Sequence, residues 1–149
     1  MPQEAFDYID TQPTCVLAVE MTDGSPHAAT VHFAHVGEEP KFIFLTERRY
    51  RKFEPFGKRD TVRATVVVGT SEADNKTLQL DGTAVITENE SHIVAYYNKF
   101  STKKRENLEA DNDVFLVFTP TWWRYTDWTL PEGKTIWTSD GGVTVKAKK

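Results

Sequence analysis

The chain has 149 residues, of which 39% are hydrophobic and 27% charged, and its formal net charge at pH 7 is -4. This length permits a single domain, residues 1–149, with a substantial core, and the composition excludes a disordered chain. No apolar run approaches the roughly eighteen residues of a membrane span, and no secretory signal is apparent, so we expect a cytoplasmic protein. The single cysteine, Cys15, lies in an apolar stretch and is predicted to be a buried core thiol rather than a nucleophile.

The first third of the chain predicts a short helix followed by strands. Phe6 and Ile9 have helical spacing within residues 2–11. Apolar and β-branched stretches then predict strands at 14–21, 26–35 and 41–46, which we expect to form a three-stranded meander. Asp23 and Gly24 are typical of a hairpin turn between the first two strands, because glycine accepts a positive φ.

The remaining sequence continues mainly as strands. Strands are predicted at 61–69, 76–87 and 114–118, and a final hairpin at 135–138 and 143–146. Gly82, inside an alternating stretch, indicates a bulge or a close approach of two backbones. Residues 88–108 have helical periodicity. This order predicts a mainly β fold, an antiparallel barrel of six or seven strands with peripheral helices.

Residues 41–63 form the most basic part of this acidic chain. Eight basic and three acidic residues give the stretch a local charge of +5. We expect a strand that ends at Thr46, a short turn, and a helix that runs to about Phe56. A threonine at a strand end and cations in the first turn of a helix suit a phosphate group. The alternative is a solvated charged face, but cations at a helix start oppose the helix dipole unless an anion is present, which favours an anion site.

Four motifs occur in an order that is similar to one known family. The second strand begins with a D-G-x-P-H-A hairpin at 23–28, and Leu45-Thr46 precedes Arg51-Lys52 at the spacing T-x-x-x-x-R-K. Residues 78–84 are similar to V-x-V-x-G-x-A, and residues 118–128 contain Pro120 followed by tryptophans up to Trp128. Together they resemble the FMN-binding split barrels of the pyridoxamine 5'-phosphate oxidase-like family, in particular its small general-stress-protein branch.

The resemblance implies a homodimer that binds two FMN molecules at its interface. Backbone groups of residues 29–34 would line the edge of the flavin ring, Leu45 and Thr46 would contact the ribityl chain, and Arg51 with Lys52 would bind the phosphate. A tryptophan of the second subunit, Trp122 or Trp128, would pack near the ring. The cofactor-binding residues implied in this way are Ala29, Thr30, Val31, His32, Leu45, Thr46, Arg51, Lys52, Thr77 and Trp128.

The chain also departs from the oxidases of that family. The family's second-strand arginine falls at Ala29 and its glutamine at Thr77. Its substrate-binding arginine and histidine have no counterpart after Trp128, so the resemblance does not extend to vitamin B6 oxidation. Arg48 and Arg49 are candidates to supply the missing positive charge.

A flavin enzyme needs few catalytic side chains, because the flavin itself accepts hydride or electrons. We therefore assign no catalytic residue and expect electron transfer between the flavin and a small organic substrate or nicotinamide, with Thr30 or His32 near the ring. His27 and His35 fall on one face of the predicted strand and His32 on the other, so no metal site is expected.

Two alternatives stay open. One is a protein that holds flavin, deazaflavin or haem for storage, sensing or stress protection without turnover. The other is a protein that binds single-stranded nucleic acid along the basic stretch, with Trp122, Trp123 and Tyr125 as stacking platforms. The acidic remainder of the chain disfavours the nucleic-acid interpretation.

Overall fold

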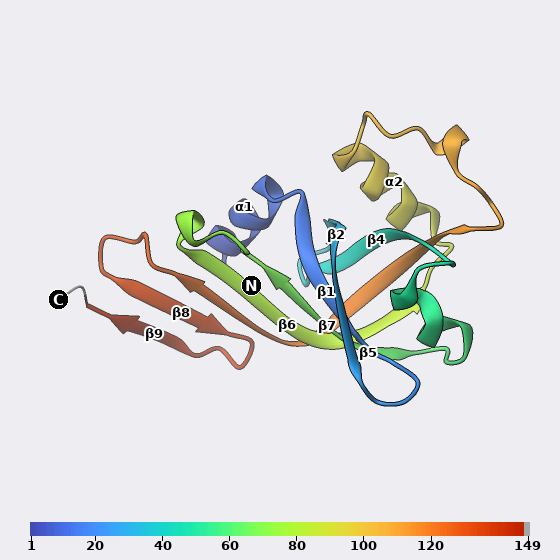
Figure 1. Ribbon diagram of the computed structural model, residues 1–149. Coiled ribbons are helices and arrows are strands. Elements are labelled where there is room, and N and C mark those ends of the chain that lie inside the picture. The colour runs from blue at the N-terminus through green and yellow to red at the C-terminus, as the bar shows by residue number, and fades with distance from the viewer. Residues whose placement is uncertain (148–149) are drawn as a thin grey trace.

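A computed structural model describes residues 1–147 and shows a protein built mainly of antiparallel strands (Figure 1). Within these residues, the strands are β1 (Thr14–Glu20), β2 (Pro26–His32), β3 (Ala34–Val36), β4 (Lys41–Glu47), β5 (Val62–Val68), β6 (Lys76–Ile86), β7 (Asp113–Asp127), β8 (Lys134–Thr138) and β9 (Val143–Lys146). The helical elements are α1 (Gln3–Thr11), α2 (Glu90–Lys99) and the 3-10 helices η1 (Arg51–Gly57), η2 (Glu72–Asp74) and η3 (Arg105–Asn107). The predicted fold class, a mainly β antiparallel split barrel with peripheral helices, is confirmed.

The sheet curls because one chain segment supplies both of its outer strands. The strand order is β2-β1-β5-β6-β7-β4-β3, with the β8 and β9 hairpin added at β7. β2 and β3 stand at opposite ends of this order, although only Phe33 separates them in the chain. Phe33 is fully buried, and its backbone N–H donates to the carbonyl of Pro13 at 3.3 Å. The chain therefore leaves one sheet edge at Phe33 and joins the other.

Two predictions about these strands are wrong. Residues 26–35 do not form one strand, because the chain breaks at Phe33, and the predicted meander is absent because β4 pairs with β3 and β7 rather than with β2. In residues 1–147 nine strands replace the six or seven expected. The break divides one predicted strand, and the hairpin of β8 and β9 lies outside the curled part, at the left of Figure 1.

Alternating side chains of the strands fill the interior. On β1, for example, Cys15, Leu17 and Val19 are buried while the residues between them are only partly covered. Each such apolar side chain stabilises the fold by about 1.5–3 kcal/mol relative to exposure. Burial raises the pKa of the Cys15 thiol to about 12, so the thiol stays protonated at neutral pH. The prediction of a buried core thiol is confirmed.

The two α-helices cover different parts of the sheet (Figure 1). α1 agrees with the helix predicted over 2–11 and buries Ala5, Tyr8 and Ile9 against the interior cluster. α2 packs on the opposite side of β3 and β4, where Tyr96 joins Ile43 in a second apolar cluster. No helix within residues 1–147 is long and apolar enough to cross a membrane.

The helix predicted over 88–108 is much shorter in the structure. The Asn89 side chain accepts a hydrogen bond from the backbone N–H of Ser91, which caps the start of α2, and the helix ends at Lys99. The Lys99 ammonium donates to the carbonyls of Ile9 at 3.3 Å and Gln12 at 2.7 Å. This contact with the end of α1 holds the last turn of α2 in place.

The helix expected after Thr46 is a seven-residue 3-10 helix that begins only at Arg51. Pro55 lies inside it, and a proline supplies no backbone N–H for a regular α-helical ladder. Phe53 and Phe56 stack with their ring centroids 5.9 Å apart and are buried, so the predicted apolar side is confirmed. The argument from a helix dipole does not apply to so short a helix.

Gly82 marks the point where β6 and β7 approach most closely. The pairing shifts between Asp81 and Gly82, and Thr121 is the extra residue on β7. A Cβ atom at Gly82 would lie 2.1 Å from the Thr119 carbonyl oxygen and 2.9 Å from the Pro120 Cα. The predicted bulge and close backbone approach are both confirmed.

We predict that Gly82→Ala destabilises the protein by about 1–3 kcal/mol, because the backbone of β7 must move away from the new methyl group. Gly57→Ala is the matched control, since a Cβ atom there meets nothing within 4 Å. Urea unfolding followed by tryptophan fluorescence measures both. Equal stability of the two variants would contradict the close approach.

Candidate functional site

Four cations of the basic stretch form no ion pair within residues 1–147. Arg49 pairs with Glu47, Lys58 lies 3.9 Å from Glu54, and Arg59 and Arg63 both pair with Glu20. Of the four cations that remain, Lys41 lies at the start of β4, and the other three lie in η1 or in the turn before it: Arg48, Arg51 and Lys52. Unpaired cations that gather at one place favour an anion site over a solvated face.

Lys52 is the least exposed of these three cations. Its ammonium nitrogen lies 4.3 Å from the centroid of the Tyr50 ring. Burial lowers the pKa of Lys52, although the nearby charge of Glu47 opposes that shift. Arg48 lies over Phe53, with 5.2 Å from the guanidinium carbon to the ring centroid. Both cations thus lie over aromatic rings, although Arg48 remains exposed and only Lys52 is partly buried.

Thr46 contributes a buried hydroxyl group that has no partner. Its side chain is 3% exposed, and its Oγ1 makes no hydrogen bond within the described residues. Thr46 faces the interior, as Phe42 and Phe44 do, whereas Leu45 faces the α2 side. Buried hydroxyls are nearly always hydrogen-bonded in folded proteins, so an unsatisfied one next to unpaired cations fits a site for a polar ligand. The side chains of Leu45 and Thr46, which were predicted to act together, therefore lie on opposite faces of β4, and only Thr46 directs a polar group into the interior.

The predicted ring-binding stretch lies on an edge strand. β2 pairs with β1 and, within residues 1–147, with no other strand, so one row of its backbone groups is free. Val31 is buried and Ala29 partly buried, whereas Thr30 and His32 face outward. The His32 ring meets the Phe100 ring edge-on at 5.2 Å, and burial, followed by the charge of Lys103, lowers the pKa of His32.

β2 and η1 are neighbours, so the ring-binding and phosphate-binding residues belong to one region. η1 packs against both β1 and β2. Hydrogen bonds from Ser25 and, more weakly, the charge of Arg51 lower the pKa of Asp23 in the turn that joins those strands. β2 also contacts β4, the strand that carries Thr46. The elements that carry residues 29–32, Thr46, Arg51 and Lys52 are therefore neighbours.

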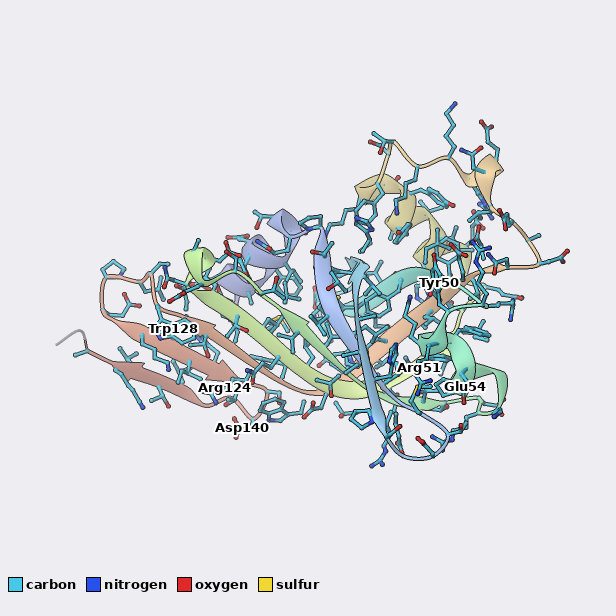
Figure 2. All side chains as sticks on the ribbon, in the orientation of Figure 1. Tyr50, Arg51, Glu54, Arg124, Trp128 and Asp140 are labelled. Carbon is cyan, nitrogen blue, oxygen red and sulfur yellow. The ribbon has the colours of Figure 1, made fainter. Side chains whose placement is uncertain are left out.

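Thr77 and Trp128 form a separate group at the far end of the barrel. The Thr77 hydroxyl donates to the Val68 carbonyl at 3.3 Å, and the Trp128 backbone N–H donates to the carbonyl of Asn75 at 2.9 Å. Both line a cavity of about 340 Å³. Figure 2 shows Trp128 at the opposite end of the molecule from Arg51. Within one chain, the ten predicted residues thus make two sites rather than one.

The histidines of β2 and β3 do not gather. His35 Nε2 lies 2.7 Å from an Asp10 carboxylate oxygen, and the His35 ring packs beside Phe6. Among residues 1–147, no group of three or more histidine, cysteine, aspartate or glutamate side chains is arranged to hold a metal ion.

Sequence reasoning missed the residues that shape the turn before η1. Glu47 accepts hydrogen bonds from the Tyr50 hydroxyl at 2.8 Å and from the Asn112 amide at 3.0 Å. The i, i+3 spacing of Glu47 and Tyr50 was a weak local signal. Asn112 is 65 residues away, and nothing in its own neighbourhood points to this contact.

Comparison with known proteins adds the family. The sequence profile described as pyridoxamine 5'-phosphate oxidase matches residues 1–127 of this chain. The chain belongs to the pyridoxamine 5'-phosphate oxidase family. The resemblance that the four motifs suggested is therefore confirmed, and the match includes η1, β2 and the basic stretch. A comparison with curated protein sequences found no match.

Solved structures of this family share the fold. A protein from Clostridium acetobutylicum related to general stress protein 26 has a TM-score of 0.67 at 14% identity, with 93% of this chain and 94% of that chain covered. A pyridoxamine 5'-phosphate oxidase-related, FMN-binding protein from Nostoc punctiforme has a TM-score of 0.57 at 13% identity, with 92% and 88% covered. A heme binding protein from Mycobacterium smegmatis has a TM-score of 0.67 at 13% identity, with 97% and 56% covered. At these identities the likeness concerns the fold alone.

We predict that Thr46→Val leaves the cofactor-free protein as stable as the wild type or stabilises it by about 1 kcal/mol, because the lost hydroxyl had no partner. Thr135→Val is the control: Thr135 is 2% exposed, and its hydroxyl donates to the Gly133 carbonyl at 3.2 Å. That variant should lose about 1 kcal/mol. Thermal unfolding without added ligand compares the two, and a clear loss of stability in Thr46→Val would show that its hydroxyl is already satisfied.

Proposed function

We propose that this protein binds FMN and acts as a flavin-dependent oxidoreductase. The observation that carries the proposal is the unsatisfied Thr46 hydroxyl in the same region as the unpaired cations Arg51 and Lys52. An FMN molecule carries a phosphate dianion and a hydroxylated ribityl chain, which are the complementary groups. Membership of the oxidase family supports the same cofactor.

Each residue of this region has a defined role in the proposal. Arg51 and Lys52 bind the phosphate through charge-assisted hydrogen bonds, and Thr46 bonds the ribityl chain. Leu45 shields that chain from the α2 side. The free edge of β2, residues 29–32, bonds the polar edge of the ring through backbone groups, with Thr30 and His32 beside it. The bound flavin supplies the ability to accept hydride or electrons from a small organic substrate or a nicotinamide.

The second candidate is a carrier that binds a flavin, a deazaflavin or haem without turnover. Haem is one of these candidate ligands because His32 can bind iron. The His32 side chain is exposed and its pKa is lowered, so a neutral imidazole is available to an iron atom at neutral pH. The fold shared with a heme binding protein is consistent with that reading. Reduction of the bound cofactor by NADPH separates the enzyme from the carrier.

We further propose that residues 1–149 form one FMN-binding domain that works as a homodimer in the cytoplasm. The position of Thr77 and Trp128 supports the dimer, because Trp128 lies at the opposite end of the molecule from Arg51 (Figure 2) and Thr77 lines the same cavity as Trp128. A second subunit can bring its own Thr77 and Trp128 to the first subunit's phosphate site. The outer face of β1, β5 and β6 carries a cavity of about 530 Å³, which offers space for such a contact.

One prediction of this proposal concerns the phosphate-binding residues. We expect wild-type protein to bind FMN saturably, seen as quenching of flavin fluorescence, and Arg51→Ala with Lys52→Ala to weaken binding at least about 100-fold. The matched control, Lys58→Ala with Arg63→Ala, removes the same charge from ion-paired positions and should bind within about threefold of wild type. Unchanged binding by the first variant would refute the phosphate assignment, and circular dichroism checks that its fold is intact.

The second prediction concerns the shared site. Trp128→Ala and Arg51→Ala/Lys52→Ala chains should each bind FMN poorly as homodimers. Refolding the two together should restore tight binding at about a quarter of the sites, because each mixed dimer holds one site with both halves intact. Titration of the mixture with FMN measures that fraction. If mixing restores no tight sites while both variants remain folded, the site is not shared between subunits.

A further inference from the structure

The turn between β4 and η1 is held by one carboxylate. Glu47 accepts hydrogen bonds from the Tyr50 hydroxyl and the Asn112 amide and pairs with the Arg49 guanidinium. Asn112 also accepts a hydrogen bond from the Arg48 backbone N–H at 2.8 Å. These contacts tie the turn to the segment just before β7 and fix the direction of the Tyr50 side chain.

Fixing Tyr50 also fixes Lys52. The face of the Tyr50 ring lies 4.3 Å from the Lys52 ammonium, a distance typical of a cation–π contact. A lysine side chain otherwise samples many rotamers, and its ammonium acts as a mobile point charge. The ring restricts that freedom and leaves the N–H donors on the far side of the Lys52 ammonium available to an anion. Figure 2 shows Tyr50 and Arg51 at the same end of the molecule.

Glu47 forms an ion pair with one of the cations near this turn, Arg49, and leaves the others without a carboxylate partner. Hydrogen bonds from Asn112, then Tyr50, lower the pKa of Glu47, so it stays charged at neutral pH and holds Arg49. Arg51 and Lys52 have no such partner. Arg48 and Arg49 were the two candidates to supply the positive charge that the oxidases have and this chain lacks. Arg49 is paired with Glu47, so only Arg48 remains a candidate.

We propose that Tyr50, held by Glu47, is a positioning residue that places the Lys52 ammonium for the cofactor phosphate. The inference rests on the proposed FMN function for the identity of the anion. The placement of Lys52 itself does not depend on that function and is tested separately.

The first measurement is the NMR shift of the Lys52 εCH₂ protons in cofactor-free protein. Because these protons lie over the face of an aromatic ring, we expect them upfield of those of the other lysines. Tyr50→Phe keeps the ring and should keep a shift of this kind, whereas Tyr50→Leu should abolish it. Unshifted Lys52 protons in the wild type would overturn the proposed placement.

The second measurement is a double-mutant cycle on FMN affinity. Tyr50→Leu should weaken FMN binding about fivefold. Tyr50→Phe keeps the ring but loses the hydroxyl that donates to Glu47, so it should weaken binding less than Tyr50→Leu does. In a Lys52→Ala background, Tyr50→Leu should have no further effect, because its role passes through Lys52.

Each outcome of the cycle has a distinct meaning. The same loss from Tyr50→Leu with and without Lys52 would show a structural effect and overturn the positioning role, as would no loss at all. Wild-type protein that shows the ring-shifted Lys52 signal but binds no FMN would overturn the proposed function and the phosphate role of Tyr50 together, while confirming the placement of the ammonium.

Discussion

The break at Phe33 is the constraint on which the rest of this structure depends. By ending β2 and starting β3 within one residue, the chain occupies both outer positions of the strand order. The burial of Phe33 and its hydrogen bond to Pro13 keep that break in the core. One consequence is that β2 keeps a free edge next to η1, so backbone groups and unpaired cations meet without any insertion or extra domain.

The same geometry bears on the proposed homodimer. β6 runs the length of the barrel, so Thr77 at its start is far from the η1 end, and Trp128 follows β7 back to the Thr77 end. A rigid sheet cannot bring its two ends together around one ligand. Two copies related by a twofold axis can, because an isologous contact places one end of each chain beside the other end of its partner. The division of the predicted residues into two groups is therefore compatible with the proposed site shared between two subunits.

The sequence predicted those features that depend on local chemistry. Alternating apolar residues located most strands, Asp23-Gly24 located a turn, and Gly82 located the bulge. The features it missed depend on contacts between distant residues. The residues around Lys99 do not indicate its hydrogen bond to the carbonyl of Gln12 at the end of α1. Likewise, the residues around Glu47 do not indicate its hydrogen bond with Asn112. Pro55 was a local signal against a regular α-helix after Thr46. The cofactor residues came from family motifs, which carry no information on which subunit supplies them.

The unsatisfied groups at η1 argue for a ligand on energetic grounds. Several charges of this chain are paired: Arg63 has Glu20, Arg105 has Glu90, and the buried Asp127 carboxylate has Thr129, Tyr125 and Lys76. Within residues 1–147, two buried side-chain polar atoms have no hydrogen-bond partner, Thr46 Oγ1 and His35 Nδ1. Leaving a buried hydroxyl unbonded costs about 1–3 kcal/mol, and placing cations side by side adds repulsion. The Thr46 hydroxyl and the unpaired cations Arg51 and Lys52 therefore lower the stability of the free protein. An anion with hydroxyl groups removes both penalties on binding, so the stability given up in the free protein returns as affinity for the ligand.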